Sequence, residues 1–209
     1  MNMLLVAIIF SIAVVGGAYY FAIYMSKGTV RNMDQRIVEM ALALGLPRPK
    51  IQSSKLSAFH SAELRGKVEG KEFYFTNFTK SEKTSDAYLT MFYWKLDKPV
   101  SGNISITRES IKSTLKKQFG GQDIEIGHKE FDETFLVKGD NTALAKFILT
   151  TSISADLLKK EKGIYGTITI QHDEIRYEES GLLLNVEDLQ RLLRLIDTCK
   201  EIAIQIEKF

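Results

Sequence analysis

The chain has 209 residues, a size that fits one domain of roughly 150 residues behind an N-terminal segment. Its 28 basic and 26 acidic residues give a net charge of +2, so no basic face of the kind that binds nucleic acid is expected. The one cysteine, Cys199, excludes an internal disulfide and is expected to be a small packing residue in the last helix.

In the N-terminal segment Met3–Met25 only Ser11 and the tyrosines carry polar side-chain groups, and the first charged side chain is that of Lys27. A helix needs about 20 apolar residues to cross the hydrocarbon core of a bilayer. The sequence therefore predicts a transmembrane helix over residues 1–26. The alternative is a cleaved signal peptide with its cleavage site at Gly16-Gly17-Ala18, but that would need basic residues ahead of a shorter apolar run.

Basic residues flank this helix only on its C-terminal side, beginning with Lys27 and Arg31. By the positive-inside rule, we expect the rest of the chain in the cytoplasm, at the surface of the cell membrane. Three tyrosines would form an aromatic belt at the cytoplasmic headgroups: Tyr19, Tyr20 and Tyr24. Ala13 and Gly17 are small residues four apart, a spacing that lets two membrane helices approach closely, although small residues are common in any membrane helix.

Residues 27–46 keep a helical period, with apolar side chains on one face from Val30 to Leu44 before Gly45 ends the pattern. We expect a juxtamembrane amphipathic helix here. Its apolar stripe has three candidate partners: the bilayer, the soluble domain or another subunit. Residues 47–61 are expected to be a linker.

The soluble domain is expected over residues 62–209. Alternating apolar residues predict strands over 62–68, 73–78, 88–96, 103–107, 123–126 and 134–137, with a hairpin at Glu69-Gly70-Lys71. A short basic helix is expected over 110–119, two short helices capped by Asp140 and Ser154, a hairpin over 164–171 and 174–178, and a final helix over 186–206 capped by Asn185. The order predicts an α+β fold: an N-terminal transmembrane helix, then a mostly antiparallel sheet packed by two short helices and a long C-terminal helix.

The segment Phe131–Asp140 reads FDETFLVKGD and is followed by Ala143 and Leu149-Thr150. It resembles a family of uncharacterised bacterial and archaeal membrane-anchored proteins with a domain of unknown function, whose pattern is Phe-acidic-x-x-Phe-x-Val-x-x-Asp. Gly139 and Thr151 depart from that pattern, where the family usually has an acidic residue and a proline. The resemblance spans about residues 124–204 and implies a fold without any known catalytic residue. The residues themselves favour packing, because Phe131, Phe135 and Val137 would face one core on an extended segment.

Three side chains near this motif form a weak candidate metal site: His128, Glu130 and Asp132. On a strand they would point the same way, and His60 or His172 would have to complete the ligand set. A polar strand edge or loop explains them better, so we expect no metal and no other cofactor. No phosphate-binding loop, nucleophile elbow or dinucleotide fingerprint occurs.

The sequence predicts a non-enzymatic interaction or scaffold protein of unknown pathway that is anchored by one membrane helix. It would recruit a protein partner, or form a homo-oligomer, at the cytoplasmic face of the bilayer. The alternative is a lipid- or small-ligand-binding domain at the membrane, whose aromatic-rich sheet, capped by helices, would hold a pocket against the bilayer. An enzyme is the third hypothesis and would need a cluster around His128, Asp132 or His172.

Overall fold

The structure is a computed structural model that describes residues 28, 31–53, 60–79, 88–111 and 122–209. The membrane helix expected over residues 1–26 lies outside these ranges, together with Ala13, Gly17, the three tyrosines of the expected belt and Lys27. Among the described residues, none of the helices combines the length and the apolar composition that a membrane span requires.

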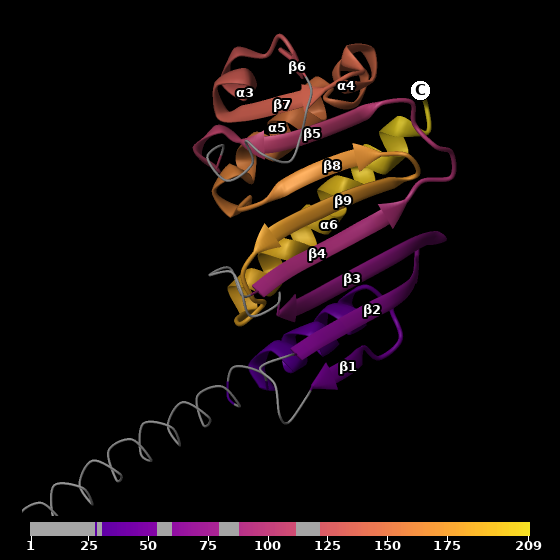
Figure 1. Cartoon of the computed structure of the whole chain (residues 1–209), viewed down its shortest axis with the longest axis vertical. Helices are drawn as coiled ribbons and strands as arrows, with labels where there is room; N and C mark the ends of the chain where they lie inside the picture. Colours follow the sequence, from indigo (N-terminus) through magenta and orange to yellow (C-terminus); the bar gives the residue numbers. More distant parts are fainter. Residues whose placement is uncertain (1–27, 29–30, 54–59, 80–87, 112–121) are drawn as a thin grey trace, which may run out of the picture.

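The described part of the chain builds one antiparallel sheet of nine strands in the order β1-β2-β3-β4-β9-β8-β5-β7-β6 (Figure 1). The strands have these bounds: β1 Lys50–Ser53, β2 His60–Val68, β3 Lys71–Thr79, β4 Tyr88–Lys95, β5 Asn103–Arg108, β6 Gln122–Asp123, β7 Phe135–Gly139, β8 Thr167–Gln171 and β9 Glu174–Ser180. The α+β class and the mostly antiparallel sheet are confirmed. The hairpin β8–β9 lies between β4 and β5, so strands that follow one another in sequence are separated in the sheet.

Both expected hairpins are present because their turns have residues that adopt positive φ. Between β2 and β3, Glu69 and Gly70 have φ values of 51° and 86°, which is the two-residue turn that fits the twist of a hairpin. Between β8 and β9, His172 has a φ of 52°. His172 therefore lies in the turn of this hairpin, as expected.

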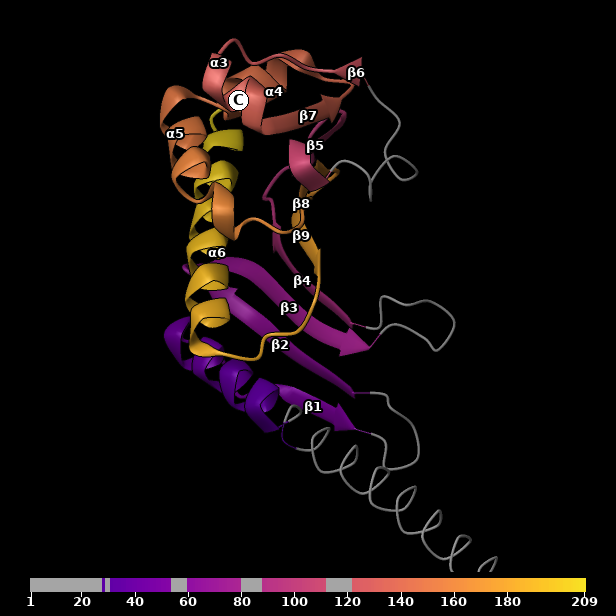
Figure 2. The same cartoon turned by 90° about the vertical axis from the view of Figure 1, so that its left-hand side faces the viewer.

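The helices have these bounds: α3 Lys129–Thr134, α4 Thr142–Ile148, α5 Thr151–Lys159, and α6 Val186–Ile206, with short 3-10 helices η1 Glu109–Ile111 and η2 Glu161–Gly163. Another helix covers residues 31–43. Figure 2 shows this helix and α6 on one face of the sheet, whereas no described helix lies over the other face of β2, β3, β4 and β9. We call that second face of these four strands the outer face.

Large apolar side chains fill the layer between the sheet and the helices. From the sheet come Phe73, Phe75, Phe92, Trp94 and Tyr177, each at most 2% exposed. Met33, Ile37 and Met40 are equally buried, so the stripe of residues 31–43 packs on the domain, one of its three candidate partners. Cys199 is fully buried in the same core, as expected of a packing residue.

The structure corrects several local expectations. The expected linker contains β1, which pairs with β2 from Lys50 opposite Glu63 to Ser53 opposite His60. Asn141 caps α4 in place of Asp140, its Oδ1 accepting a hydrogen bond from the amide of Leu144. The remaining differences are these: α5 starts at Thr151, so Ser154 lies buried inside it, and Ala143 is exposed. Of the basic helix expected over residues 110–119, only residues 110 and 111 are described, as part of η1. Asn185 does cap α6, whose bounds agree with the prediction.

Candidate functional site

A row of arginine and tyrosine side chains crosses the outer face. Arg65 on β2 pairs with Tyr74 on β3, Tyr74 with Tyr93 on β4, and Tyr93 with Arg176 on β9. We call these four residues the tyrosine row. Directly opposed residues on neighbouring strands lie close enough for their side chains to interact, and here the two tyrosine rings are 5.0 Å apart between centroids.

Cationic groups flank both ends of the two rings. The guanidinium carbon of Arg65 lies 4.7 Å from the centroid of the Tyr74 ring, within cation–π distance. At the other end, Arg176 contacts Glu174, and its Nε is buried without a hydrogen-bond partner among the described residues. Partial burial raises the pKa of Tyr93, so its hydroxyl is neutral at physiological pH.

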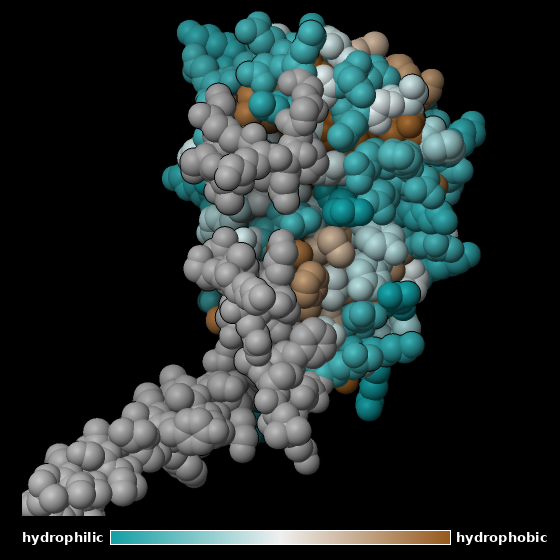
Figure 3. All heavy atoms as spheres, in the orientation of Figure 1, coloured by the Kyte–Doolittle hydropathy of each residue, from teal (hydrophilic) through white to brown (hydrophobic). Residues whose placement is uncertain are grey.

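Charged side chains lie on one side of the tyrosine row, and a more apolar pair lies on the other side, beyond a row that contains Thr76, Met91 and Glu178. Lys95 ends β4 near Glu72 and Asp173, at 4.0 Å and 3.8 Å, so one side is polar and hydrated. On the other side, Phe78 pairs with Leu89, and both are half-buried. Figure 3 looks onto this face and shows hydrophilic residues with small apolar groups between them.

A second cluster is buried beneath the covered face and joins β9 to α6. Arg191 is 9% exposed and binds the Glu179 carboxylate through both terminal nitrogens, at 2.7 Å and 2.5 Å. It also donates to the carbonyl of Gly163 at 3.1 Å. The hydroxyl of Tyr177 donates to Glu179 at 2.5 Å. Burial, then the charge of Glu179, raises the pKa of Tyr177 well above its ordinary value.

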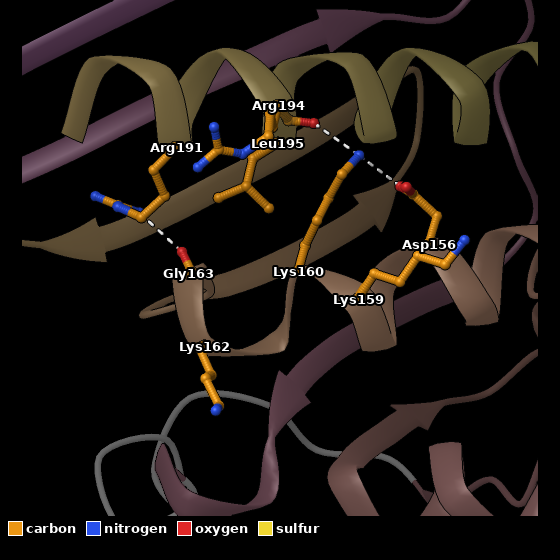
Figure 4. A pocket seen from close by; sticks show the side chains of 8 residues that line it. All are labelled: Asp156, Lys159, Lys160, Lys162, Gly163, Arg191, Arg194 and Leu195. Atoms are coloured by element: carbon orange, nitrogen blue, oxygen red, sulfur yellow. Dashed lines mark hydrogen bonds and ion pairs between the residues drawn. The ribbon is translucent and has the colours of Figure 1, made fainter. Parts of the chain in front are cut away.

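Beside Arg191, a cavity of about 430 Å³ opens between α5 and η2 on one side and α6 on the other (Figure 4). We call it the α5–α6 cavity. Five basic side chains, one carboxylate, a glycine and a leucine line it: Lys159, Lys160, Lys162, Arg191, Arg194, Asp156, Gly163 and Leu195. The side chains that line this cavity therefore carry a net positive charge.

The three candidate metal ligands do not lie on a strand, so the expected geometry is wrong. His128 caps α3, its Nδ1 accepting a hydrogen bond from the amide of Phe131. Asp132 accepts from the amides of Ile126 and Gly127, at 2.9 Å each. Glu130 is exposed, and in the described residues no three His, Cys, Asp or Glu side chains gather as a metal site would require. His128 and Asp132 therefore stabilise the start of α3 and the loop before it.

The motif that carried the family resemblance packs as expected, although partly on a helix. Phe131 lies on α3 and stacks on Phe135 of β7 with ring centroids 4.9 Å apart, and both are buried with Val137. Of the residues expected at the membrane, Arg31 alone is described, and it is exposed at the start of the helix of residues 31–43.

Sequence reasoning missed both the tyrosine row and the buried ion pair. A signal for the pair was present: Glu179 shares the buried parity of Ile175 and Tyr177 on β9. Likewise, Arg191 lies one turn before buried Leu195 on α6. A charged residue in a buried position of each of two elements points to a pair, because an isolated buried charge is strongly unfavourable.

The fold defines a class: an α+β domain with an antiparallel sheet that is covered by helices on one face. The family described as "Protein of unknown function (DUF3137)" matches residues 90–203, just over half of the 209 residues, and the chain belongs to that family. The resemblance to an uncharacterised-domain family is thus confirmed at that level. No curated protein matches the chain in sequence.

One solved structure of similar fold is the crystal structure of the mycobacterial trehalose monomycolate transport factor A, TtfA. The TM-score is 0.53 and the sequence identity 9%, over 84% of this chain and 95% of that chain. At this identity the likeness shows a shared fold alone.

Proposed function

We propose that this protein is a membrane-tethered, non-enzymatic interaction module. It recruits a protein partner, or a second copy of itself, at the cytoplasmic face of the cell membrane. The observation that carries the proposal is the tyrosine row at the centre of a sheet face over which no described helix lies. Tyrosine and arginine are the residue types that contribute most binding energy in protein interfaces.

The arrangement of the row supports binding because its side chains are held before a partner arrives. Tyr74 and Tyr93 contact each other across the strands, and Arg65 lies on the Tyr74 ring. Ordering such side chains in advance lowers the entropy that association would otherwise lose. The charged side chains around Lys95 would form the polar rim that surrounds the centre of an interface.

The tether and its orientation rest on the sequence. The apolar segment Met3–Met25 is long enough to span a bilayer, and the basic residues follow it. The protein of similar fold is named a transport factor, which is consistent with a supporting role beside a membrane process. Resistance of the full chain to alkaline extraction from membranes tests the anchor; release into the soluble fraction would refute it.

The orientation has its own test. A cysteine placed at exposed Glu201 should react with a membrane-impermeant maleimide only after cells are lysed, because a cytoplasmic domain is shielded by the membrane. The native Cys199 is buried, so the labelling reports on the introduced cysteine. Labelling of intact cells would place the domain outside and refute the cytoplasmic assignment.

The interaction itself is tested with full-length protein in mild detergent. The wild type should migrate as a complex larger than the monomer. The double variant Tyr74→Ala/Tyr93→Ala should lose that complex, since truncating a central interface residue costs 2 kcal/mol or more, about 30-fold in affinity. Tyr165→Ala is the matched control, because Tyr165 is an exposed tyrosine with its own arginine contact outside the row.

Two results would contradict the proposal. One is wild-type protein that is monomeric with no co-purifying protein. The other is a double variant that keeps the complex while Tyr165→Ala behaves identically. Fluorescence of Trp94, the one tryptophan of the chain, reports whether each variant is folded.

The alternative is a lipid- or small-ligand-binding domain, in which the aromatic-rich sheet capped by helices would hold a pocket against the membrane. Side chains such as Phe92 and Trp94 fill the layer between the sheet and the helices. The specific observation that keeps ligand binding as a second candidate is the α5–α6 cavity, most of whose lining residues are basic.

A further inference from the structure

We propose that the α5–α6 cavity binds a phosphate group, carried by a free phosphorylated compound or by the headgroup of an acidic lipid. This site is separate from the tyrosine row and does not depend on the proposed function. The argument rests on which cations of the cavity are already paired, how the wall is built, and how large the space is.

Two of the five basic side chains have internal partners. Lys160 donates to Asp156 at 2.7 Å and to the Thr198 hydroxyl at 2.8 Å, so it ties α5 to α6. Arg191 is held by Glu179. The one carboxylate of the lining is therefore neutralised within the protein, and the attraction for an anion comes from the remaining cations.

Those remaining cations are Lys159, Lys162 and Arg194. Within the described ranges, no ion pair or side-chain hydrogen bond joins any of the three to a carboxylate. They come from α5, η2 and α6, so positive charge borders the cavity from each element that forms it. A phosphate group has several acceptor oxygens and a charge between −1 and −2, which suits several cations better than one.

The wall at Arg191 is fixed before any ligand binds. Its guanidinium is held by two bonds to Glu179 and one to the Gly163 carbonyl, and the Tyr165 ring lies 4.6 Å from its central carbon. Gly163 allows this approach, because a Cβ there would come within 3.1 Å of the Arg191 stem. The Nε of Arg191 is buried and has no hydrogen-bond partner among the described residues.

A buried donor without an acceptor is rare in native proteins and calls for an explanation, of which a bound anion or water is one. The unpaired cations Lys159, Lys162 and Arg194 supply the positive charge that would attract such an anion. The cavity of about 430 Å³ lies within the size range of small-ligand sites and exceeds what a bare phosphate ion fills. A phosphate attached to a larger group uses that space better.

The test is calorimetric titration of the full-length chain in a nonionic detergent at constant ionic strength. Three probes are compared: inorganic phosphate, dihexanoyl phosphatidic acid and dihexanoyl phosphatidylcholine. The proposal predicts saturable binding of at least one of the first two and none of the third. Binding of phosphatidic acid alone assigns a lipid headgroup, whereas binding of inorganic phosphate, alone or with it, assigns the phosphate group itself.

The variant Lys162→Gln/Arg194→Gln removes two unpaired cations of the cavity and leaves Arg191 in place. It should weaken binding at least tenfold. The matched control Lys129→Gln/Lys146→Gln removes the same charge from exposed positions on α3 and α4, and it should change affinity less than twofold.

Three outcomes overturn the proposal. They are absence of saturable binding by either phosphate probe, equal losses of affinity in the two double variants, and binding of phosphatidylcholine as tight as that of phosphatidic acid. None of them bears on the tyrosine row, whose variants leave the α5–α6 cavity intact.

Discussion

The buried ion pair between Arg191 and Glu179 makes the sharpest stability prediction. Arg191→Met keeps an unbranched side chain at this buried position of α6 but removes both hydrogen bonds to the carboxylate, at 2.7 Å and 2.5 Å, and the one to Gly163. Glu179 is 5% exposed, so its charge would remain in the protein interior with the Tyr177 hydroxyl as its one donor among the described residues. Removing one partner of such a pair costs about 3–5 kcal/mol.

For a chain of this length, that loss corresponds to a melting temperature lower by about 6–20 °C. Urea unfolding of the full-length protein in mild detergent, followed by Trp94 fluorescence, measures the loss in free energy of unfolding. Arg191→Met/Glu179→Gln should be more stable than Arg191→Met alone, because no uncompensated charge is left buried. Exposed Arg194→Met, one turn on, should stay within about 0.5 kcal/mol of wild type. A single Arg191 variant as stable as wild type would refute the reasoning.

Three further predictions concern groups whose environments the structure defines. Because burial and Glu179 raise the pKa of Tyr177, the folded protein keeps this proton above pH 10, where the unfolded chain loses it. Stability should therefore fall as pH rises above 10, by up to about 1.4 kcal/mol per pH unit from this group, and Tyr177→Phe should remove that part of the slope between urea unfolding curves at pH 9 and 11. Burial raises the pKa of the Cys199 thiol, so maleimide should label the folded protein far more slowly than the chain in urea; equal rates would contradict the buried position. Asp132→Ala should lower stability by about 1–2 kcal/mol through loss of its two bonds to backbone amides, and added Zn²⁺ should leave the wild-type unfolding midpoint unchanged, whereas a rise would restore the metal hypothesis.

Local sequence signals were enough for the elements whose geometry is local. The hairpin at Glu69-Gly70 and the long helix α6 were predicted because turn residues and an asparagine cap act within a few residues. Strand β1 was missed because its four residues, KIQS, have no apolar alternation and form a strand only by pairing with β2. Caps at Asp140 and Ser154 were misplaced because several polar residues near each helix start offer similar side-chain acceptors.

The order of the strands could not be derived in the same way. The hairpin β8–β9 inserts between β4 and β5, and only the packing of distant residues selects that arrangement. The tyrosine row depends on it, since Tyr93 meets Arg176 only because β4 pairs with β9. The α5–α6 cavity depends on the fold in the same way, because its lining residues come from α5, η2 and α6, which only tertiary packing places next to one another.

The central claim is that the tyrosine row binds a protein at the membrane, and site-specific photocrosslinking in intact membranes tests it most directly. A benzoylphenylalanine replaces Tyr93 in one protein and exposed Glu201 on α6 in another. On irradiation, position 93 should give one discrete adduct, twice the chain mass for a homo-oligomer or the added mass of a partner, and position 201 should give none. No adduct at position 93, or the same adducts at both positions, would contradict the claim.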